Sequence, residues 1–218
     1  MAGAAPETHA AWFQLTLSVA RRVILPDQHD SSQGYDAVAE EFAVRRDSHI
    51  GVPQVTAWAE ALPRGAAVLD LGCGTGVPIS EALIRAGCSV HGVDASSQMV
   101  AAFRARFADV PVVCEPIEQS ALFGREFDGV IAWGVMFLLA AEVQAEVIRR
   151  VSRALCTGGS FLFTSPFQAC TWSDSLTARL SVSLGAEAYR HLLTAEGLTV
   201  VREFHDDGDN YYCQSRKL

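Results

Sequence analysis

The sequence has a single lysine, Lys217, and no stretch in which basic residues cluster. With 25 acidic against 17 basic residues, the formal net charge is −8 at pH 7. Nucleic acids and anionic membrane surfaces bind through clustered positive charge, so this composition argues against both as partners. No apolar run approaches the roughly 18 residues of a membrane span, and the N-terminus lacks the pattern of a signal peptide.

The six cysteines are scattered, with no CxxC pair and no Cys/His spacing that is typical of a zinc site. Several of them lie in apolar runs, where a reduced cysteine behaves as a small hydrophobic residue. We therefore expect free thiols, no bound metal and a cytoplasmic location.

Half of the 218 residues are hydrophobic, which is enough for one domain with a substantial core. Residues 1–33 are predicted to form an N-terminal helical appendage, and residues 34–218 the main domain. Within the appendage, 11–25 has apolar residues at helical spacing and Pro26 ends the pattern. That helix either packs on an edge of the core or acts as a lid over a pocket.

From Tyr35 onward, the patterns of strand and helix alternate. We expect strands at 66–70, 89–94, 111–115, 127–133, 158–166, 198–205 and 210–217. We expect helices at 35–46, 52–62, 77–87, 96–107, 140–155 and 185–197. Such alternation predicts an α/β fold with a mostly parallel sheet that is covered on both faces. The last two strands are joined by a short polar turn and should pair antiparallel.

The segment AAVLDLGCGTGVPI (66–79) combines an apolar strand, an acid at its end and a glycine-rich loop. Glycines stand at every second position of that loop, namely Gly72, Gly74 and Gly76. Because glycine has no Cβ, the backbone there can approach a ligand closely. Open parallel sheets bind their ligands at this edge, so the loop predicts a binding site.

Two acids narrow the choice of ligand. Asp94 ends the next strand, where a carboxylate can accept hydrogen bonds from both hydroxyls of a ribose. Asp70 would repel a pyrophosphate and suits a ligand with a positive amino group. The third glycine also comes one residue too early for a dinucleotide fingerprint, and no GK[ST] follows to make a Walker loop. The residues thus indicate a nucleoside ligand that carries a cationic group.

These motifs resemble those of the class I S-adenosylmethionine-dependent methyltransferases. VLDLGCGTG (68–76) resembles motif I, and VHGVDAS, VVCEPIE, FDGVIAWG and LCTGGSFLFTSP resemble the following motifs in the expected order. The resemblance covers residues 35–217. It implies a Rossmann-like sheet of seven strands, mostly parallel with the last strand antiparallel, and helices on both faces. It also implies S-adenosyl-L-methionine as cofactor, S-adenosyl-L-homocysteine as product and a small-molecule acceptor.

The resemblance assigns roles by position. Asp70 would lie near the methionine amino group, and Asp94 would bind the ribose. Glu115 stands where many members have an aspartate that accepts from the adenine amino group. Its greater length and the following proline would shift the adenine contact toward Ile117. The implied cofactor-binding set is Tyr35, Asp70, Gly72, Cys73, Gly74, Gly76, Asp94, Ala95, Ser96, Met99, Glu115, Pro116, Ile117 and Trp133.

Three members of this set have further or alternative roles. Cys73 is expected to be a small loop residue and not a nucleophile. Trp133 either faces the methionine arm or is simply part of the core. Tyr35 and Arg45 resemble an N-terminal pattern that closes over the cofactor, although Arg45 and Arg46 are more commonly surface ion-pair residues.

Methyl transfer to an oxygen acceptor would also require a base. Candidates are His49, His191, His205 and Tyr35. We select His205 as the catalytic residue, because it lies near the end of a predicted strand and faces the acidic turn DDGDN. No Asn/Asp-Pro-Pro-Tyr follows the fourth strand, which disfavours methylation of DNA adenine or of glutamine.

The acceptor is expected to lie against the segments 135–139 and 168–180. An apolar pocket with few polar groups is typical of a small organic substrate. The predicted substrate set is Met136, Phe137, Phe167, Trp172 and Asp174, with the aspartate as polar anchor. The alternative is that these aromatic residues pack the core, which we favour for Phe137.

Other functions stay open to different degrees. The glycine spacing and Asp70 count against a nicotinamide-dependent oxidoreductase. A non-catalytic sensor or partner subunit that binds S-adenosylmethionine fits the same motifs, because no base is certain. A protein methyltransferase would need an open groove. We expect a monomer or a homodimer.

Overall fold

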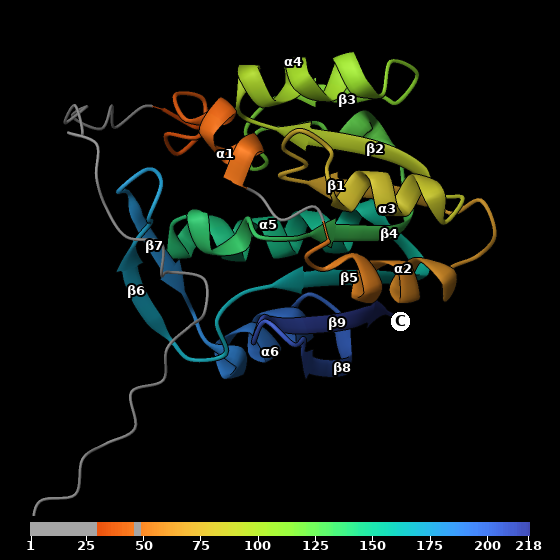
Figure 1. Ribbon diagram of the computed structural model, residues 1–218. Helices are drawn as coiled ribbons and strands as arrows, with labels where there is room; N and C mark the ends of the chain where they lie inside the picture. Colours follow the sequence, from red (N-terminus) through yellow and green to blue (C-terminus); the bar gives the residue numbers. More distant parts are fainter. Residues whose placement is uncertain (1–29, 46–48) are drawn as a thin grey trace, which may run out of the picture.

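A computed structural model describes residues 30–45 and 49–218 (Figure 1). The predicted helix 11–25, most of the predicted appendage and Arg46 therefore lie outside the described residues. The helices are α1 Ala39–Arg45, α2 Val52–Glu60, α3 Ile79–Arg85, α4 Ser97–Arg106, α5 Ala141–Ala154 and α6 Ala186–Ala195, with 3₁₀ turns η1 Leu122–Gly124 and η2 Met136–Leu138. The strands are β1 Ala67–Leu71, β2 Ser89–Asp94, β3 Val112–Cys114, β4 Phe127–Ala132, β5 Leu155–Thr164, β6 Cys170–Ser173, β7 Leu180–Ser183, β8 Leu198–His205 and β9 Tyr211–Lys217.

Seven strands form one sheet in the order β3-β2-β1-β4-β5-β9-β8. Neighbouring strands are parallel except at β9, which is antiparallel to both β5 and β8. The predicted fold class is thus confirmed. The strand order reverses between β1 and β4, and such a switch point is where open α/β sheets bind ligands at the carboxyl ends of their strands. This edge lies on the left in Figure 1.

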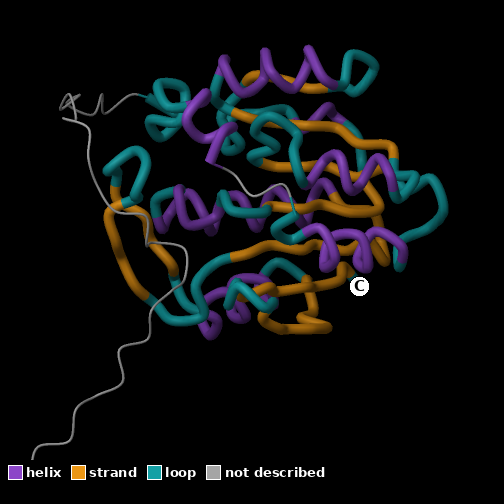
Figure 2. The backbone as a smooth tube through the Cα atoms, in the orientation of Figure 1, coloured by secondary structure: helices purple, strands orange, loops and turns teal. Residues whose placement is uncertain are grey.

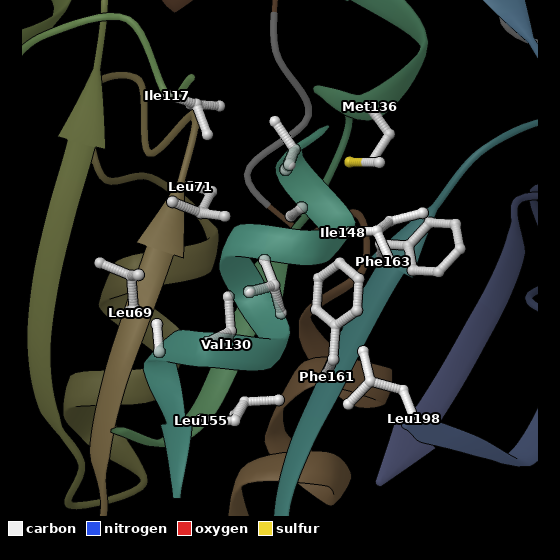
Figure 3. Close-up of a cluster of buried hydrophobic side chains, with 14 of the residues drawn as sticks. Leu69, Leu71, Ile117, Val130, Met136, Ile148, Leu155, Phe161, Phe163 and Leu198 are labelled. Carbon is white, nitrogen blue, oxygen red and sulfur yellow. The ribbon is translucent and has the colours of Figure 1, made fainter. Parts of the chain in front are cut away.

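The face covered by α5 and α6 holds the larger core cluster. Val147, Ile148 and Val151 lie on one face of α5 and are fully buried. They pack with sheet residues that include Leu69 and Val130 (Figure 3). Burial of each such side chain contributes about 1.5–3 kcal/mol, so this apolar stripe fixes α5 on the sheet.

The opposite face is covered by α2 and α3. Trp58 of α2 and Leu83 of α3 pack against Val68 and Val90 of the sheet. The Trp58 indole also donates a hydrogen bond of 2.9 Å to the buried Ser160 hydroxyl on β5. Within the described ranges, no helix is long and apolar enough to cross a membrane.

The start of α1 differs from the sequence prediction. The helix begins at Ala39 and not at Tyr35, because turns precede it. The Asp30 carboxylate accepts from the N–H groups of Ser32 and Gly34, each at 2.9 Å. These bonds hold the chain in turns, since a side-chain acceptor offers the backbone an alternative to the helix.

The hairpin formed by β6 and β7 was not predicted. It forms a two-stranded sheet of its own and projects from the carboxyl edge of the main sheet (Figures 1 and 2). Three of the four β6 residues are exposed, so the strand has no buried face. A strand without a buried face shows no alternation of apolar and polar residues, and that alternation is the signal that identifies strands in a sequence.

Candidate active site

The glycine-rich loop follows β1 and is attached to the end of β2. The N–H groups of Gly72 and Cys73 donate to the Val93 carbonyl at 2.8 and 3.1 Å. Gly72, Gly74 and Gly76 have φ angles of 68°, 54° and 81°, which L side chains rarely adopt. The loop conformation therefore needs glycine at all three positions.

The three glycines differ in what they face. A Cβ added at Gly72 would stand 2.5 Å from Val135, and one at Gly76 would stand 2.6 Å from Phe107. A Cβ at Gly74 would meet nothing within 4 Å. At two positions the missing Cβ thus makes room for the protein's own side chains. Of the three, Gly74 is the one that faces open space.

Asp70 is 2% exposed and lies at the end of β1. Its Oδ2 accepts a hydrogen bond of 2.5 Å from the Ser80 hydroxyl on α3. Ser80 was not predicted as a site residue. Its position in the first turn of the helix after the glycine loop could have indicated that it lies near Asp70. The hydroxyl orients the carboxylate, because a charge-assisted hydrogen bond is short and strong.

Asp94 connects the loop to α4. Its Oδ2 accepts from the Gly74 N–H and its Oδ1 from the Ser96 N–H, both at 2.8 Å. Burial raises the pKa of this carboxyl above its usual value, and the two backbone hydrogen bonds oppose that shift. The carboxylate is thus held in a defined position at the edge of the sheet.

The residues after Asp94 begin α4. Ser96 caps the helix, since its hydroxyl accepts from the Met99 N–H at 3.2 Å. Met99 is almost fully buried under the helix. The Ala95 carbonyl lies 3.8 Å from the Cys114 thiol at the end of β3. Of the predicted binding residues 95, 96 and 99, Ala95 lies on the loop between β2 and α4, whereas the Met99 side chain is buried.

The loop after β3 lies beside Asp94. The Glu115 N–H donates to the Asp94 carbonyl at 2.9 Å, and the Glu115 side chain is exposed. Pro116 accepts from two following N–H groups in a turn, and Ile117 is buried in the main core cluster. Glu115 is therefore an exposed polar residue of this loop that is bonded directly to the end of β2.

Cys73 fills space inside the loop. It is buried, and a Cβ at Gly92 would come within 2.8 Å of its sulfur. Burial is the main reason why the pKa of its thiol lies well above the usual value. Repulsion from the Asp70 and Asp94 carboxylates raises it further. A thiolate is therefore disfavoured at this position, and nucleophilic chemistry with it.

Trp133 follows β4 and belongs to the core on the α2 face. Its indole N–H donates to the buried Tyr212 hydroxyl at 3.0 Å, and that hydroxyl donates to Asp206 at 3.0 Å. A Cβ at Gly51 would lie 2.7 Å from the same indole nitrogen. The indole thus packs between α2 and β9, and a role at the methionine arm stays a prediction.

The predicted acceptor residues after β4 separate into two kinds. Met136 is fully buried in the main core cluster, so it does not line an open surface (Figure 3). Phe137 is partly exposed and contacts Trp172 of the hairpin, with ring centroids 5.4 Å apart. The favoured alternative of core packing therefore applies to Met136, and Phe137 packs on the hairpin instead.

Phe167 and His205 lie together at the far end of the same edge. Phe167 is 42% exposed, and its ring contacts Tyr211 at 5.3 Å and His205 at 6.0 Å. The predicted orientation of His205 by the acidic turn is not observed. Asp206 instead accepts from Gly208, Asn210 and Tyr212, and in the described part of the chain the His205 ring forms no hydrogen bond.

The position of His205 also limits its reach. It ends β8, which lies four strands from β1 in the sheet. At about 4.8 Å per strand, the separation between β8 and β1 is roughly 19 Å. A base at this distance could serve only an acceptor that extends along the edge away from the glycine loop.

Tyr35 and Asp174 meet although 139 positions separate them. The Tyr35 hydroxyl donates to Asp174 Oδ2 at 3.3 Å. Asp174 Oδ1 caps the hairpin turn by accepting from the N–H groups of Leu176 and Thr177. Asp174 is therefore partly occupied in holding the turn, and its proposed contact with an acceptor stays untested.

The remaining predicted polar residues lie on the surface. Arg45 pairs with Glu41 one turn away at 2.8 Å, and both side chains are exposed. His191 lies 4.0 Å from Glu187 on the exposed face of α6. Across residues 30–45 and 49–218, no group of three or more His, Cys, Asp or Glu side chains is placed to hold a metal ion.

Comparison with known proteins agrees with this arrangement. Residues 68–159 match the sequence profile of a family described as "Methyltransferase domain". The chain is 30% identical over 139 residues to the tRNA (carboxymethyluridine(34)-5-O)-methyltransferase ALKBH8 of Mus musculus. That match covers 62% of this chain and 20% of the relative, so the chain spans about a fifth of that protein's length.

Solved structures share the fold at low sequence identity. Magnesium protoporphyrin IX methyltransferase from Synechocystis PCC 6803, with bound SAM, has a TM-score of 0.68 and 18% identity over 91% of this chain and 100% of its own. The 1,6-didemethyltoxoflavin-N1-methyltransferase of Burkholderia thailandensis has a TM-score of 0.70 and 20% identity, covering 89% and 92%. The CcbJ methyltransferase of Streptomyces caelestis has a TM-score of 0.69 and 17% identity, covering 88% and 99%. Residues 68–159 thus match a methyltransferase domain, and the solved structures share the fold, in agreement with the resemblance found in the motifs.

Proposed function

We propose that this chain, which carries a methyltransferase domain on the class I fold, binds S-adenosyl-L-methionine and transfers its methyl group to a small organic acceptor. The observation that carries the proposal is the gathering of three features at one edge of the sheet. These are the glycine loop after β1, the Asp94 carboxylate after β2 and the exposed Glu115 after β3.

The residues at this edge fit the cofactor group by group. Asp94 would accept from the ribose hydroxyls, and its two backbone donors hold it in place before binding. Glu115 would accept from the adenine amino group. Asp70 offers a negative charge to the methionine ammonium, oriented by Ser80. The open side of Gly74 leaves the backbone accessible to the ligand between these acids.

The bound cofactor would supply a sulfonium whose methyl group is already electrophilic. The protein then has to hold the acceptor in line with that methyl group and exclude water, since positioning alone lowers such a barrier strongly. The Phe137–Trp172 pair provides an apolar wall for the acceptor beside η2. His205 is a candidate base only for an acceptor that reaches along the edge toward β8.

We place the acceptor among small organic molecules for two reasons. The curated relative acts on tRNA, but this chain has a net charge of −8 and no basic run to neutralise phosphates. The partly exposed Phe137 and Trp172 form an aromatic pair between η2 and the hairpin, and apolar side chains are typical of the lining of small-ligand sites. A soluble monomer or homodimer without nucleic-acid or membrane partners is part of the same proposal.

The first test is calorimetric titration of the purified chain with S-adenosylmethionine, S-adenosylhomocysteine and NAD. We expect micromolar binding of the first two and none of NAD. Asp94→Ala should abolish binding, whereas Asp109→Ala, which removes an exposed carboxylate on the loop after α4, should leave it unchanged. Thermal melting of both variants shows whether each is folded, so that a loss of binding can be distinguished from a loss of the fold. Binding of NAD alone, or of no ligand, would refute the proposal.

The second test asks whether the chain is an enzyme or a sensor. S-adenosylhomocysteine release is measured over a panel of small oxygen, nitrogen, sulfur and carbon acceptors, with unmodified tRNA as a further member. Turnover with a small acceptor supports the proposal. Binding without turnover across the panel favours the sensor, and turnover with tRNA alone would assign the acceptor to RNA.

A further inference from the structure

Residues 30–36, which we call the strap, join two parts of the carboxyl edge that are far apart in the sequence. On one side the strap contacts the turn of the β6–β7 hairpin, and on the other it contacts the start of α4. Figure 1 shows this segment and α1 beside the amino end of α4. The contacts at both ends are polar and specific.

The hairpin end of the strap is fixed by an ion pair and a hydrogen bond. Arg179 Nη2 lies 2.9 Å from Asp30 Oδ2, with side chains only 15% and 29% exposed. The Tyr35 hydroxyl donates to Asp174 in the same turn. A partly buried pair of this kind is screened less by salt than a surface pair, so it can hold the strap on the turn.

The other end is fixed by Asp36. Its Oδ1 accepts from the Ser96 hydroxyl at 2.8 Å, the Ser97 hydroxyl at 3.1 Å and the Gln98 N–H at 3.0 Å. A carboxylate at this place also interacts favourably with the positive end of the helix dipole. The hydrogen bond from Gln98 is the main reason why the pKa of Asp36 lies below its usual value.

Ser96 links Asp36 to the proposed ribose acid. Its hydroxyl donates to Asp36, and its N–H donates to Asp94 Oδ1 at 2.8 Å. Ser96 is 1% exposed, and both bonds are partly buried. Any displacement of Asp36 therefore changes the position of a residue that orients Asp94.

We infer that Asp36 is a positioning residue: it holds Ser96, and through it Asp94, and it couples the cofactor site to the hairpin through the strap. The inference rests on the proposed function. Residues 35 and 36 are adjacent, and they bond to the hairpin and to α4 respectively. Loosening the hairpin end should therefore weaken binding at Asp94, although the turn does not touch that site.

The test measures the Kd of S-adenosylhomocysteine for single and double variants. Asp36→Ala removes all three bonds and should raise the Kd roughly tenfold. Asp36→Asn keeps an oxygen acceptor and should raise it by only about threefold. Glu40→Gln changes an exposed carboxylate in the first turn of α1 and serves as the matched control with an unchanged Kd. A merely structural role would lower the melting temperature and leave the Kd of the folded protein unchanged.

Arg179→Gln tests the coupling from the hairpin end. We expect a Kd about threefold higher, and an effect in the double variant with Asp36→Ala that is smaller than the product of the two. Wild-type Kd values in folded Asp36→Ala would overturn the inference, as would independent effects in the double variant. If Asp36→Ala fails to fold, Asp36→Asn and Arg179→Gln decide by the same criterion. Failure of the proposed function is distinguishable, because the wild-type chain would then bind no S-adenosylhomocysteine.

Discussion

We propose that the cofactor binds at the loops after β1, β2 and β3, here called the cofactor side, and that the acceptor binds at η2 and the β6–β7 hairpin, here called the acceptor side. These two parts of the carboxyl edge are built in different ways. On the cofactor side, the direct partners of the two acids are close in sequence: Gly74 and Asp94 are 20 positions apart, and Asp70 and Ser80 are 10 apart. On the acceptor side, Phe137 after β4 contacts Trp172 of the hairpin, and Tyr35 meets Asp174 across 139 positions. Short-range partners form one βαβ unit, whereas the acceptor side is assembled from segments that only the complete fold brings together.

The largest effect is expected from Gly72→Ala, on the cofactor side. The new Cβ would combine a left-handed φ of 68° with a 2.5 Å approach to Val135. Strain and overpacking together should cost about 3 kcal/mol of unfolding free energy. Urea denaturation measures this loss, and calorimetry measures the accompanying loss of cofactor binding.

Gly74→Ala is the matched control for that change. Its φ of 54° is also left-handed, but the added Cβ meets nothing within 4 Å. We expect a cost of about 1 kcal/mol from backbone strain alone. Equal losses in the two variants would show that the contact with Val135 does not matter.

The next effect concerns the base of the hairpin. The buried Tyr189 hydroxyl donates to Gln144 Oε1 at 2.6 Å and lies 3.0 Å from the Ser165 hydroxyl. The Gln144 amide in turn donates to the Val182 carbonyl of β7 at 2.9 Å. Tyr189→Phe leaves the buried Gln144 Oε1 without this donor and the Leu184 N–H without this acceptor, which should cost about 2 kcal/mol.

Hydrogen exchange and urea denaturation check the Tyr189→Phe prediction. Exchange of the β6 and β7 amides should accelerate, while that of the loop after β1 should change less. Equal acceleration of amide exchange at both places would show that the hairpin and the loop after β1 are not stabilised independently.

Trp172→Ala should act on the acceptor side. Removing one member of the Phe137–Trp172 pair should raise the KM of the acceptor about tenfold, which corresponds to about 1.4 kcal/mol. The Kd of S-adenosylhomocysteine should stay unchanged, because the Trp172 ring contacts Phe137 and lies outside the strap contacts. A change in Kd with an unchanged KM would place Trp172 on the cofactor side instead.

The smallest effect is a pH dependence of cofactor affinity. Burial raises the pKa of Asp94 above its ordinary value of 3.8, so its protonated form accumulates at a higher pH than for an exposed aspartate. The ribose hydroxyls need the ionised form as acceptor, and the affinity should therefore fall as the pH is lowered. We expect a higher Kd at about pH 5 than at about pH 7.

Calorimetry at several pH values measures the affinity, with Asp94→Asn as the control. The asparagine variant binds more weakly but has no carboxyl to titrate, so its Kd should not follow the same curve. An identical pH dependence in both proteins would assign the titration to another group.

Much of the cofactor side could be predicted because its signals are local. The apolar pattern predicted a strand that ends at Asp94, and β2 does end there. The seven-stranded sheet was predicted from the alternation of strands and helices and from the order of the motifs. The sequence did not reveal that Ser80 donates to Asp70, or that Asp36 accepts from Ser96 beside Asp94. No sequence pattern identifies the partner of a serine or an aspartate, because that contact depends on the backbone conformation of the loop and of the strap.

The acceptor side was predicted less well for the same physical reason. Met136 has an apolar side chain that suits a pocket or a core equally, and only the tertiary structure placed it in the main core cluster with Phe161 and Phe163 of β5. His205 was chosen for its acidic neighbours, but Asp206 is engaged with Asn210 and Tyr212. Hydrogen-bond competition of this kind is decided by three-dimensional distances.

The sheet, its helices and the glycine-rich loop could be read from the sequence alone, since periodicity, glycine spacing and strand-end acids act over short distances along the chain. The tertiary structure decided which glycine stays open, what Trp133 and Met136 pack against, and how the strap links Asp36 to α4 and Asp30 to Arg179. These features depend on contacts between segments that are distant in sequence, and their free energy is gained only when the whole sheet has formed.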